Sequence, residues 1–437
     1  MAITNPIRRV AVIGAGPSGL AAVKYLLAEK YFDKIEVFEQ RSSVGGVWNY
    51  SPSSSKKGMS TTVPHLTPHE PAEKPVWIDR AEGGEATFVS PLYDRLETNI
   101  PKELMRYSDK AFPLEAQLFP KHRAVKQYLE EYAEDVKSLI QFKTQVLEVK
   151  LKDETLSTWS LTAKSLSTGA HTTHTYDAVV VASGHFTVPY IPDIPGIQAW
   201  DTSHPGAISH SKFYDSPESF QGKKVVVVGS SASGLDIGAQ INEVSQGKVL
   251  VSQRSESYLA PPPNGDKIIY PEIVEFLLRQ PMTELFYIDH PTLVFPVLSQ
   301  RVIPFPMAEN HAAVFSRVWS ARLTLPPKDA MKAWEAAEID AKGDGKEFHL
   351  LPFPMDADYL DFLYDWAEKA NPRPGLSNNG QGKLGTRWGE RERWMRAHSP
   401  DIRRAFVQRG NERSEIKDLS ELGFDFEQWK KQQEATR

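Results

Sequence analysis

The chain contains no cysteine among its 437 residues. It can therefore form no disulfide, no thiolate metal site, no cysteine nucleophile and no CxxC redox relay. Disulfide reductases, which work through a cysteine pair, are excluded for the same reason. A large excess of charge of one sign is also absent: the formal net charge is −5. This gives no general field to attract nucleic acid or anionic lipid, so we expect no nucleic-acid partner.

Long apolar runs are missing as well. No segment approaches the roughly 18 consecutive apolar residues that a membrane helix needs. The N-terminal stretch, Met-Ala-Ile-Thr-Asn-Pro-Ile-Arg-Arg, lacks the apolar stretch and the cleavage site of a signal peptide. The polar end from Gln432 to Arg437 carries no lipidation or retention signal. These absences predict a soluble cytoplasmic protein without a membrane partner.

The residues that are present supply enough apolar material for two or three domains. Hydrophobic residues make up 40% of the chain and charged residues 24%, the balance of a soluble globular protein. A β-branched run at residues 10–13 is followed by a helical pattern at residues 20–28 and a strand pattern at residues 35–39. This order predicts a βαβ unit whose first strand is buried on both faces.

The rest of the chain divides into further predicted elements. Residues 51–85 are rich in Ser, Pro and Gly and predict an irregular surface excursion. Strands are predicted at residues 145–151, 158–163, 176–184, 224–229 and 248–252, and helices at residues 124–139 and from about residue 328 onward, with Trp334, Trp366, Trp388 and Trp394 as packing anchors.

A glycine pattern stands between the first predicted strand and helix, in the order Gly14-Ala-Gly16-Pro-Ser18-Gly19. Gly14 permits the tight turn, Gly16 lets the backbone approach a pyrophosphate, and Gly19 lets helix and strand pack closely. Glu39 follows Gly19 by 20 residues, at the end of the next strand. A carboxylate there accepts hydrogen bonds from ribose hydroxyls and repels a 2′-phosphate, which favours FAD.

A second, less specific pattern follows another β-branched run. It reads Gly229-Ser-Ser231-Ala-Ser233-Gly234, with Ser231 in the place of the middle glycine. Arg254 lies 20 residues after Gly234, where the first unit has its acid. An Arg at this position accommodates a 2′-phosphate, so the second unit is predicted to bind NADPH. The alternative for Arg254 is an ordinary solvated surface side chain.

Four further stretches together resemble flavin-containing monooxygenases of the soluble fungal type. They are Gly45-Gly46-Val47-Trp48, the segment at residues 96–109 that includes Thr98 and Asn99, the residues Gly206, His210 and Tyr214 of the family's identifier, and residues 318–326. His204 stands where that identifier has Phe. The resemblance covers most of the chain.

The resemblance implies an α/β fold of two Rossmann-like dinucleotide-binding domains, with the NADPH domain inserted in the FAD domain. It places the FAD domain at residues 1–197 and 286–437, with a helical C-terminus, and a shortened NADPH domain at residues 198–285. The motifs specify no oligomeric state.

The resemblance also implies a reaction. NADPH reduces FAD, O₂ adds to the reduced flavin, and the C4a-hydroperoxide oxygenates nitrogen or sulfur in a small amine, thiol or sulfide. The activity would be of the N,N-dimethylaniline or thiol-oxidising type. Asn99 would be the catalytic residue, bound to the peroxide and the nicotinamide, whereas taken alone it is more often a turn residue. Gly46, Val47, Trp48 and Thr98 would contact cofactor.

Two departures from the family pattern leave alternatives open. The family's further strand after the NADPH-phosphate strand is not found, because only 31 residues separate Arg254 from Phe286. A missing strand would leave a sheet edge unpaired and remove part of the wall of the flavin pocket. His311 stands where Gln is usual, and it either alters contacts near the flavin or is tolerated. The alternatives are a Baeyer–Villiger-type monooxygenase and a catalytically impaired nucleotide-binding remnant.

Overall fold

The computed structural model describes residues 3, 5–56, 59, 61–66, 73–78, 85–155, 157–252, 269–270, 285–343 and 346–436. Arg254 lies outside these described residues, so its predicted role remains a prediction.

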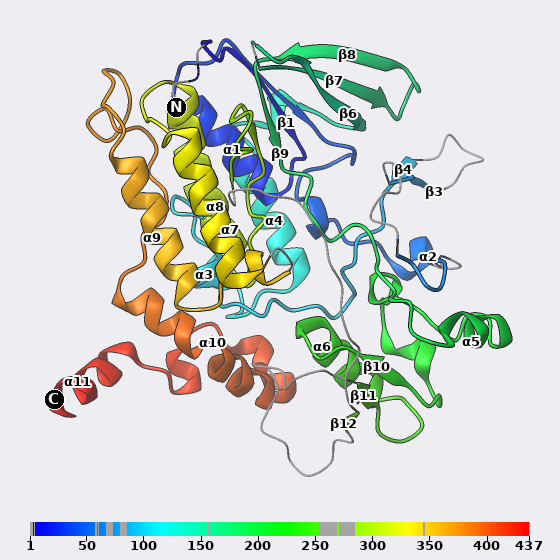
Figure 1. The fold of residues 1–437 in the computed structure, drawn as a ribbon. Coiled ribbons are helices and arrows are strands. Elements are labelled where there is room, and N and C mark those ends of the chain that lie inside the picture. Colours follow the sequence, from blue (N-terminus) through cyan, green and yellow to red (C-terminus); the bar gives the residue numbers. More distant parts are fainter. Residues whose placement is uncertain are drawn as a thin grey trace.

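A five-stranded parallel sheet forms the centre of the larger part of the molecule (Figure 1). Its strand order is β13 (Leu293–Val294), β9 (Ala178–Val181), β1 (Arg9–Ile13), β2 (Lys34–Phe38) and β5 (Ile140–Gln141). The β-branched and apolar residues of β1 and β9 fit a sheet covered on both faces, and Val10, Val12, Val179 and Val180 are fully buried. The βαβ unit predicted at the N-terminus is confirmed, with α1 at Pro17–Ala28.

Helices cover one face of this sheet and a second sheet covers the other. Val10, Val12 and Val37 pack in one core with the helices α1, α4 (His122–Tyr132) and α7 (Pro304–Trp319). Ala11, Phe38 and Val179 point the other way, into a core shared with an antiparallel sheet. That sheet consists of β6 (Thr144–Asp153), β7 (Thr158–Ser165) and β8 (His171–Tyr176). Two of its strands were predicted, and β8 adds a third.

The C-terminal part is helical, as predicted. Trp388 and Trp394 are buried, but Trp334 is 46% exposed, so its prediction as a packing anchor was wrong. Helix α7, which is buried from Phe305 to Trp319, packs between α1 and α9. The helices of this part are α7, α8 (Lys328–Lys342), η6 (Lys346–His349), α9 (Met355–Glu368), α10 (Glu390–Gln408), η7 (Gly410–Glu415), η8 (Ser420–Leu422) and α11 (Phe426–Thr436).

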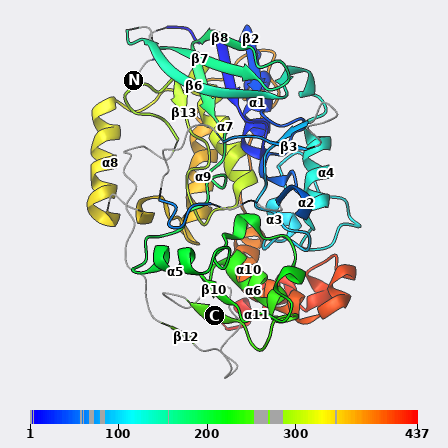
Figure 2. The ribbon, with the colours of Figure 1, turned by 90° about the vertical axis from the view of Figure 1, so that its right-hand side faces the viewer.

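A second, smaller parallel sheet has the order β10 (Val226–Val228), β11 (Leu250–Ser252) and β12 (Ile269–Tyr270). Helix α6 (Ala232–Asn242) connects β10 to β11. The chain then returns to the first sheet as β13, so the second unit is inserted into the first, and the predicted α/β fold of two dinucleotide-binding units is confirmed. Figures 1 and 2 show the second unit at the end of the molecule opposite to the β6–β8 sheet.

The second sheet is covered less completely than the first. Val226 and Val228 are 58% and 62% exposed, whereas strands of a doubly covered sheet bury such residues. Within the described residues β10 pairs only with β11, so its other edge is open.

The segment predicted as an irregular excursion contains some regular structure. Lys56, expected on the surface, is 4% exposed because its ammonium donates to the carbonyl oxygens of Leu92 and Tyr214. The remaining elements are η1 (Gly46–Trp48), α2 (Ser53–Lys56), β3 (Val76–Ile78), β4 (Glu85–Thr87), α3 (Lys102–Met105), η3 (Lys137–Leu139), α5 (Ile197–Ser203), η4 (Ser211–Phe213) and η5 (Pro217–Phe220). Across the described ranges, none of the helices combines the length and apolar character required to cross a bilayer.

Candidate functional site

The first glycine turn has the geometry that its sequence predicts. Gly14 has φ +98°, in the left-handed region, and a Cβ there would collide with the carbonyl oxygen of Ala182. A Cβ on Gly19 would collide with the carbonyl oxygen of Gly14, so only glycine lets α1 approach the turn this closely. Ser18 lies half-buried in the first turn of α1. The N-terminal N–H groups of α1 thereby face the carboxyl edge of the sheet, which is where an anion binds in such folds.

Glu39 lies beside this turn at the end of β2. Its Oε2 accepts a hydrogen bond of 2.8 Å from the backbone N–H of Ala15, and its Oε1 accepts one of 2.8 Å from the backbone N–H of Arg41. The residue is 3% exposed. A carboxylate has about four acceptor positions, so two remain for a ligand such as a ribose diol.

The loop that carries Gly46, Val47 and Trp48 is tied to the same turn. The backbone N–H of Gly45 donates to the carbonyl oxygen of Ala15 at 2.8 Å. Gly45 and Gly46 have φ +105° and +54°. A Cβ on Gly16 would lie 3.5 Å from the Cα of Gly46, so the two backbones pass each other closely.

Residues that carry no motif hold this loop in shape. The Asn49 amide donates to the carbonyl oxygens of Val44 and Gly46 at 2.9 and 3.0 Å. The Ser90 hydroxyl donates to the carbonyl oxygen of Val47 at 2.5 Å, and Lys126 donates to that of Val44 at 2.6 Å. They come from separate parts of the chain, so no spacing rule could have identified them.

A cavity of about 410 Å³ adjoins the loop and is lined in part by Trp48. Arg41, Arg123 and Lys126 give its wall an excess of positive charge. His122 also lines it and is 1% exposed, with an Nδ1 atom that has no partner among the described residues; the same holds for Nε of Arg41. Burial lowers the pKa of His122, so its ring is neutral. The glycine turn, the acid and these unpaired atoms fit a dinucleotide with an anionic centre.

Asn99 lies in a bend at the protein surface. Its side chain is exposed and makes no hydrogen bond within the described part of the chain. The preceding Thr98 is buried: its N–H donates to the carbonyl oxygen of Pro120 at 3.0 Å and its hydroxyl to that of Ile100 at 2.9 Å. The backbone around Asn99 is thus fixed while its amide is available to a ligand.

The second glycine turn has the same backbone construction as the first. Gly229 has φ +106°, and its N–H donates to the carbonyl oxygen of Ser252 at 2.8 Å. A Cβ on Gly234 would collide with the carbonyl oxygen of Gly229. Ser231 occupies the N-cap position of α6, and both Ser231 and Ser233 are exposed at its N-terminus.

Comparison with known proteins places the chain among flavoenzymes. Residues 77–281 match the family model described as flavin-binding monooxygenase-like, and residues 12–69 match an NAD(P)-binding Rossmann-like domain. The Arabidopsis thaliana flavin-containing monooxygenase FMO GS-OX3 is 34% identical over 417 residues, which cover 82% of this chain and 84% of that protein. The chain belongs to the flavin-containing monooxygenase family. FAD and NADP(H) are the family's cofactors and those of this chain.

Two further relatives refine this picture. The match to Arabidopsis FMO GS-OX5, at 35% identity, covers 56% of this chain and spans about half (49%) of that relative. The solved structure of S-allyl-L-cysteine S-oxygenase from Allium sativum has a TM-score of 0.70 and 25% identity, and the comparison covers 95% of this chain and 96% of that one.

The alignment with GS-OX3 contains gaps. It runs over 417 positions, whereas 82% of this chain is about 358 residues, so about 59 aligned positions are gaps in this chain.

Two histidines of this monooxygenase have structural roles. Nδ1 of His210 accepts a hydrogen bond of 3.1 Å from the backbone N–H of Lys212 and caps η4. His311 is fully buried: Nδ1 accepts from the N–H of Val297 at 3.1 Å, and Nε2 lies 3.2 Å from the Tyr359 hydroxyl. Burial lowers the pKa of His311 to about 3, so it stays neutral. It holds Val297 at φ +61°, a conformation that is strained for a β-branched residue.

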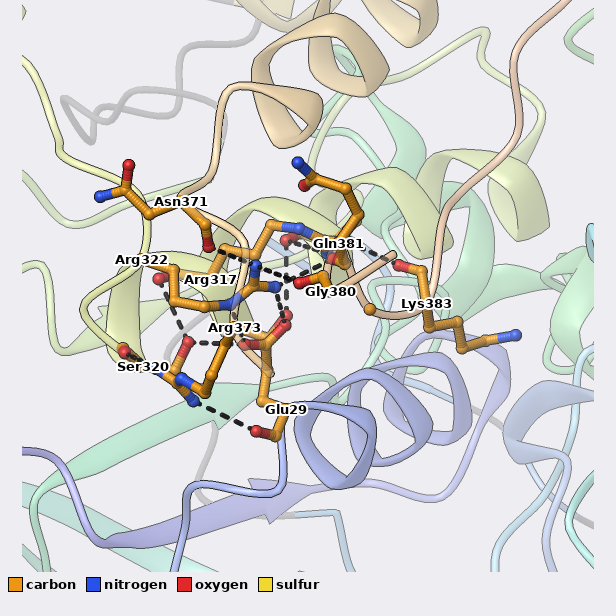
Figure 3. A network of polar contacts seen from close by, with 12 residues as sticks. Glu29, Arg317, Ser320, Arg322, Asn371, Arg373, Gly380, Gln381 and Lys383 are labelled. Carbon is orange, nitrogen blue, oxygen red and sulfur yellow. Dashed lines mark hydrogen bonds and ion pairs between the residues drawn. The ribbon is translucent and has the colours of Figure 1, made fainter. Parts of the chain in front are cut away.

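The family-like stretch at residues 318–326 owes its form to a buried polar network (Figure 3). The Arg322 guanidinium donates to both carboxylate oxygens of Glu29 at 2.7 Å, and the two side chains are 3% and 1% exposed. The Ser320 hydroxyl donates to Glu29 at 2.7 Å. Arg317 donates to the carbonyl oxygens of Gln381 and Lys383 at 2.6 and 2.9 Å. This network joins the end of α1 to α7 and the following C-terminal loop, so the stretch is structural.

Proposed function

We propose that this chain transfers one oxygen atom from O₂ to the sulfur or nitrogen of a small soft nucleophile, with a thioether sulfide as the preferred substrate. The likeness over 95% of the chain to a solved S-oxygenase is the observation that carries this proposal. The products from a sulfide, O₂, NADPH and a proton would be a sulfoxide, NADP⁺ and water. One S–O bond forms, the O–O bond breaks, and NADPH supplies the two electrons.

The first turn would hold FAD. The N–H groups at the start of α1 would bind the pyrophosphate, which can approach closely because Gly14, Gly16 and Gly19 have no side chains. Glu39 would accept hydrogen bonds from the ribose. Ser18, Gly46, Val47 and Trp48 would complete the contacts, supported by the unpaired polar atoms in the adjoining cavity.

The second turn would hold NADPH. Gly229, Ser231, Ser233 and Gly234 would surround its pyrophosphate at the start of α6, and Arg254 would bind the 2′-phosphate. The exposure of both serines supports this assignment, because their hydroxyls are free to reach a phosphate.

Bound flavin, once reduced, supplies an electrophilic oxygen atom from O₂ to the substrate sulfur. The protein's own task is to orient the reactants and exclude water. We assign Asn99 the donated hydrogen bond that holds the reacting oxygen and the nicotinamide amide, with Thr98 fixing its backbone beside the cofactor. Its exposed amide on a fixed backbone suits a preorganised donor.

The test is to incubate purified protein, reconstituted with FAD, with NADPH, a dialkyl sulfide and ¹⁸O₂. We expect sulfide-dependent NADPH oxidation and a sulfoxide that carries one ¹⁸O atom. A parallel assay with a tertiary amine in place of the sulfide distinguishes S-oxygenation from N-oxygenation. Protein that binds FAD and oxidises NADPH without labelling either substrate would overturn the proposal, and a lactone or ester formed from a ketone would favour Baeyer–Villiger chemistry.

A further inference from the structure

Three charged side chains meet behind the Asn99 bend. We call them the Glu97 cluster: Glu97, Arg403 of α10 and Arg413 of η7. Nη1 and Nη2 of Arg403 lie 3.4 and 3.5 Å from Oε2 of Glu97. Nε of Arg413 lies 3.2 and 3.1 Å from its Oε1 and Oε2. The side chain of Glu97 is 6% exposed and that of Arg403 is 14% exposed, so this pair is screened little by water.

The charge of Arg403 also acts on helix α6 of the second nucleotide unit. Tyr93 donates to Oδ2 of Asp236 of α6 at 2.5 Å, and Gln240 donates to the same oxygen at 3.1 Å. Burial raises the pKa of Asp236, while the hydrogen bond from Tyr93 and the charge of Arg403 act in the opposite direction. Arg403 thus contacts the carboxylate beside Asn99 and favours the charged form of the carboxylate on α6.

The backbone couples the position of Glu97 to that of Asn99, two residues later. Residues 96–98 run antiparallel to residues 120–122, with a bridge between Glu97 and Lys121. Glu97 is turned toward α10, whereas Leu96 packs on the apolar cluster of α6 that includes Ile237. A shift of Glu97 would therefore displace the bend at Asn99 and also disturb the packing of Leu96 against α6.

Helix α10 holds Arg403 firmly. The guanidinium carbon lies 5.0 Å from the ring centroid of Phe119 and 5.4 Å from that of Phe406, and both rings are fully buried. The backbone N–H of Leu118 also donates to the carbonyl oxygen of Ile416, just after η7, at 2.8 Å. Figures 1 and 2 show α10 and α6 beside each other at the lower end of the molecule.

We propose that Arg403 is a positioning residue through which the C-terminal helix α10 sets the place of Asn99 relative to the NADPH unit. This rests on the proposed function. Arg403 touches no reacting atom; it pairs with Glu97, whose neighbour Leu96 packs on α6, and its charge acts on Asp236 of that helix. Its loss would let the two nucleotide units and the Asn99 bend shift relative to one another, so that reducing equivalents escape as H₂O₂.

The experiment compares Arg403→Gln with Arg404→Gln in the FAD-loaded, full-length protein. Arg404 is the matched control because it lies on the same helix and pairs with Asp401 of that helix at 2.9 Å. The rate of H₂O₂ release and the KM for NADPH are measured without substrate, and flavin content and thermal midpoint are recorded. We expect Arg403→Gln to raise both readouts at least roughly threefold at unchanged flavin content, since small misplacements of reacting groups have large kinetic effects. Arg403→Lys should recover part of the loss.

Arg404→Gln should behave as wild type. If Arg403→Gln folds with full flavin and leaves both readouts at the wild-type level, the proposal is wrong. If it does not fold, Arg413→Gln replaces it, because that side chain is 34% exposed and its loss is easier to tolerate. An unchanged rate of H₂O₂ release in flavin-loaded Arg413→Gln would then overturn the proposal.

Asn99→Ala separates this proposal from the proposed function. Raised H₂O₂ release in Asn99→Ala and Arg403→Gln alike supports positioning through Asn99. Raised release in Arg403→Gln alone removes Asn99 from its role and overturns positioning through it. Failure of the wild type to oxygenate any sulfide or amine would defeat the proposed function, while the KM for NADPH and the rate of H₂O₂ release would still test Arg403.

Discussion

Individual residues decide whether this chain can hold a dinucleotide. Gly14, Gly16 and Gly19 are needed for three different reasons: a left-handed backbone, a close pass of the Gly46 loop, and close packing of helix on turn. Their roles can be tested one at a time because each meets a different neighbour.

Gly16→Val is expected to abolish flavin binding while the rest of the fold survives. A Cβ at this position already lies 3.5 Å from Cα of Gly46, and the two methyl groups of valine would occupy the space between the turn and the loop. The measurement is the visible absorbance of purified protein after reconstitution with FAD. Gly238→Ala is the control, because a Cβ there makes only an ordinary contact of 3.8 Å with Val227. Flavin retained at wild-type stoichiometry in Gly16→Val would show that this turn is not the flavin site.

Glu309 should make stability depend on pH. Its carboxylate is fully buried and accepts hydrogen bonds from Ser108 and Thr386, and burial raises its pKa from 4.5 to about 7. Between these values the folded state binds the proton more tightly than the unfolded state, so this group lowers stability as pH rises from 4.5 to about 7. Glu309→Gln keeps the shape without the titration. Its thermal midpoint relative to wild type should therefore be higher at about pH 8 than at about pH 5, and an offset independent of pH would contradict this assignment.

At the scale of helices and strands, some elements can be predicted from the sequence alone and others cannot. Strand β1, helix α1 and strand β2 were predicted correctly because their signals are local: a β-branched run, helical spacing and glycines at fixed offsets. Lys56 and Trp334 were misassigned because their burial depends on partners distant in sequence. The loop at Gly46 was predicted as part of the site, but the hydrogen bonds that shape it come from Asn49, Ser90 and Lys126, whose positions follow from tertiary packing alone.

Helices α1 and α7 are joined by the Glu29–Arg322 pair, whose loss should be costly. Glu29→Gln leaves a buried guanidinium without its anion, and breaking such a pair destabilises proteins by about 3–5 kcal/mol. Because a two-domain protein need not unfold in one step, the variants are compared by the midpoint of the same calorimetric transition and not by one free energy of unfolding. Glu131→Gln is the control, since the side chains of its ion pair with Lys110 are 27% and 45% exposed and such a surface pair contributes about 0–1 kcal/mol. Equal midpoints for the two variants would mean that the network of Figure 3 contributes little to stability.

At the scale of the whole molecule, the second nucleotide unit has fewer paired strands than the first within the described residues. The usual order of such a sheet places a fourth strand against the first, but the corresponding edge of β10 is open within those residues, and Val226 and Val228 are exposed. Residues 253–268 and 271–284 lie outside the described residues, so the missing strand expected after Arg254 stays a prediction. The expected consequence is a pocket that admits water and releases part of its reducing equivalents as H₂O₂.

The open face can be tested without any activity. Val226→Thr and Val228→Thr are expected to change stability by no more than about 0.5 kcal/mol. These side chains are exposed, so the substitutions remove little buried apolar surface. Val180→Thr is the matched control: this residue is fully buried in β9 of the complete sheet, where an unpaired hydroxyl costs about 1–3 kcal/mol. Thermal midpoints of the three variants, together with binding of a dye that reports exposed apolar surface, give the comparison. We expect dye binding by the wild type to fall in the Val226→Thr/Val228→Thr double variant. If that variant is instead destabilised as much as Val180→Thr, part of this chain or a second copy covers the face in solution, and the second unit is complete after all.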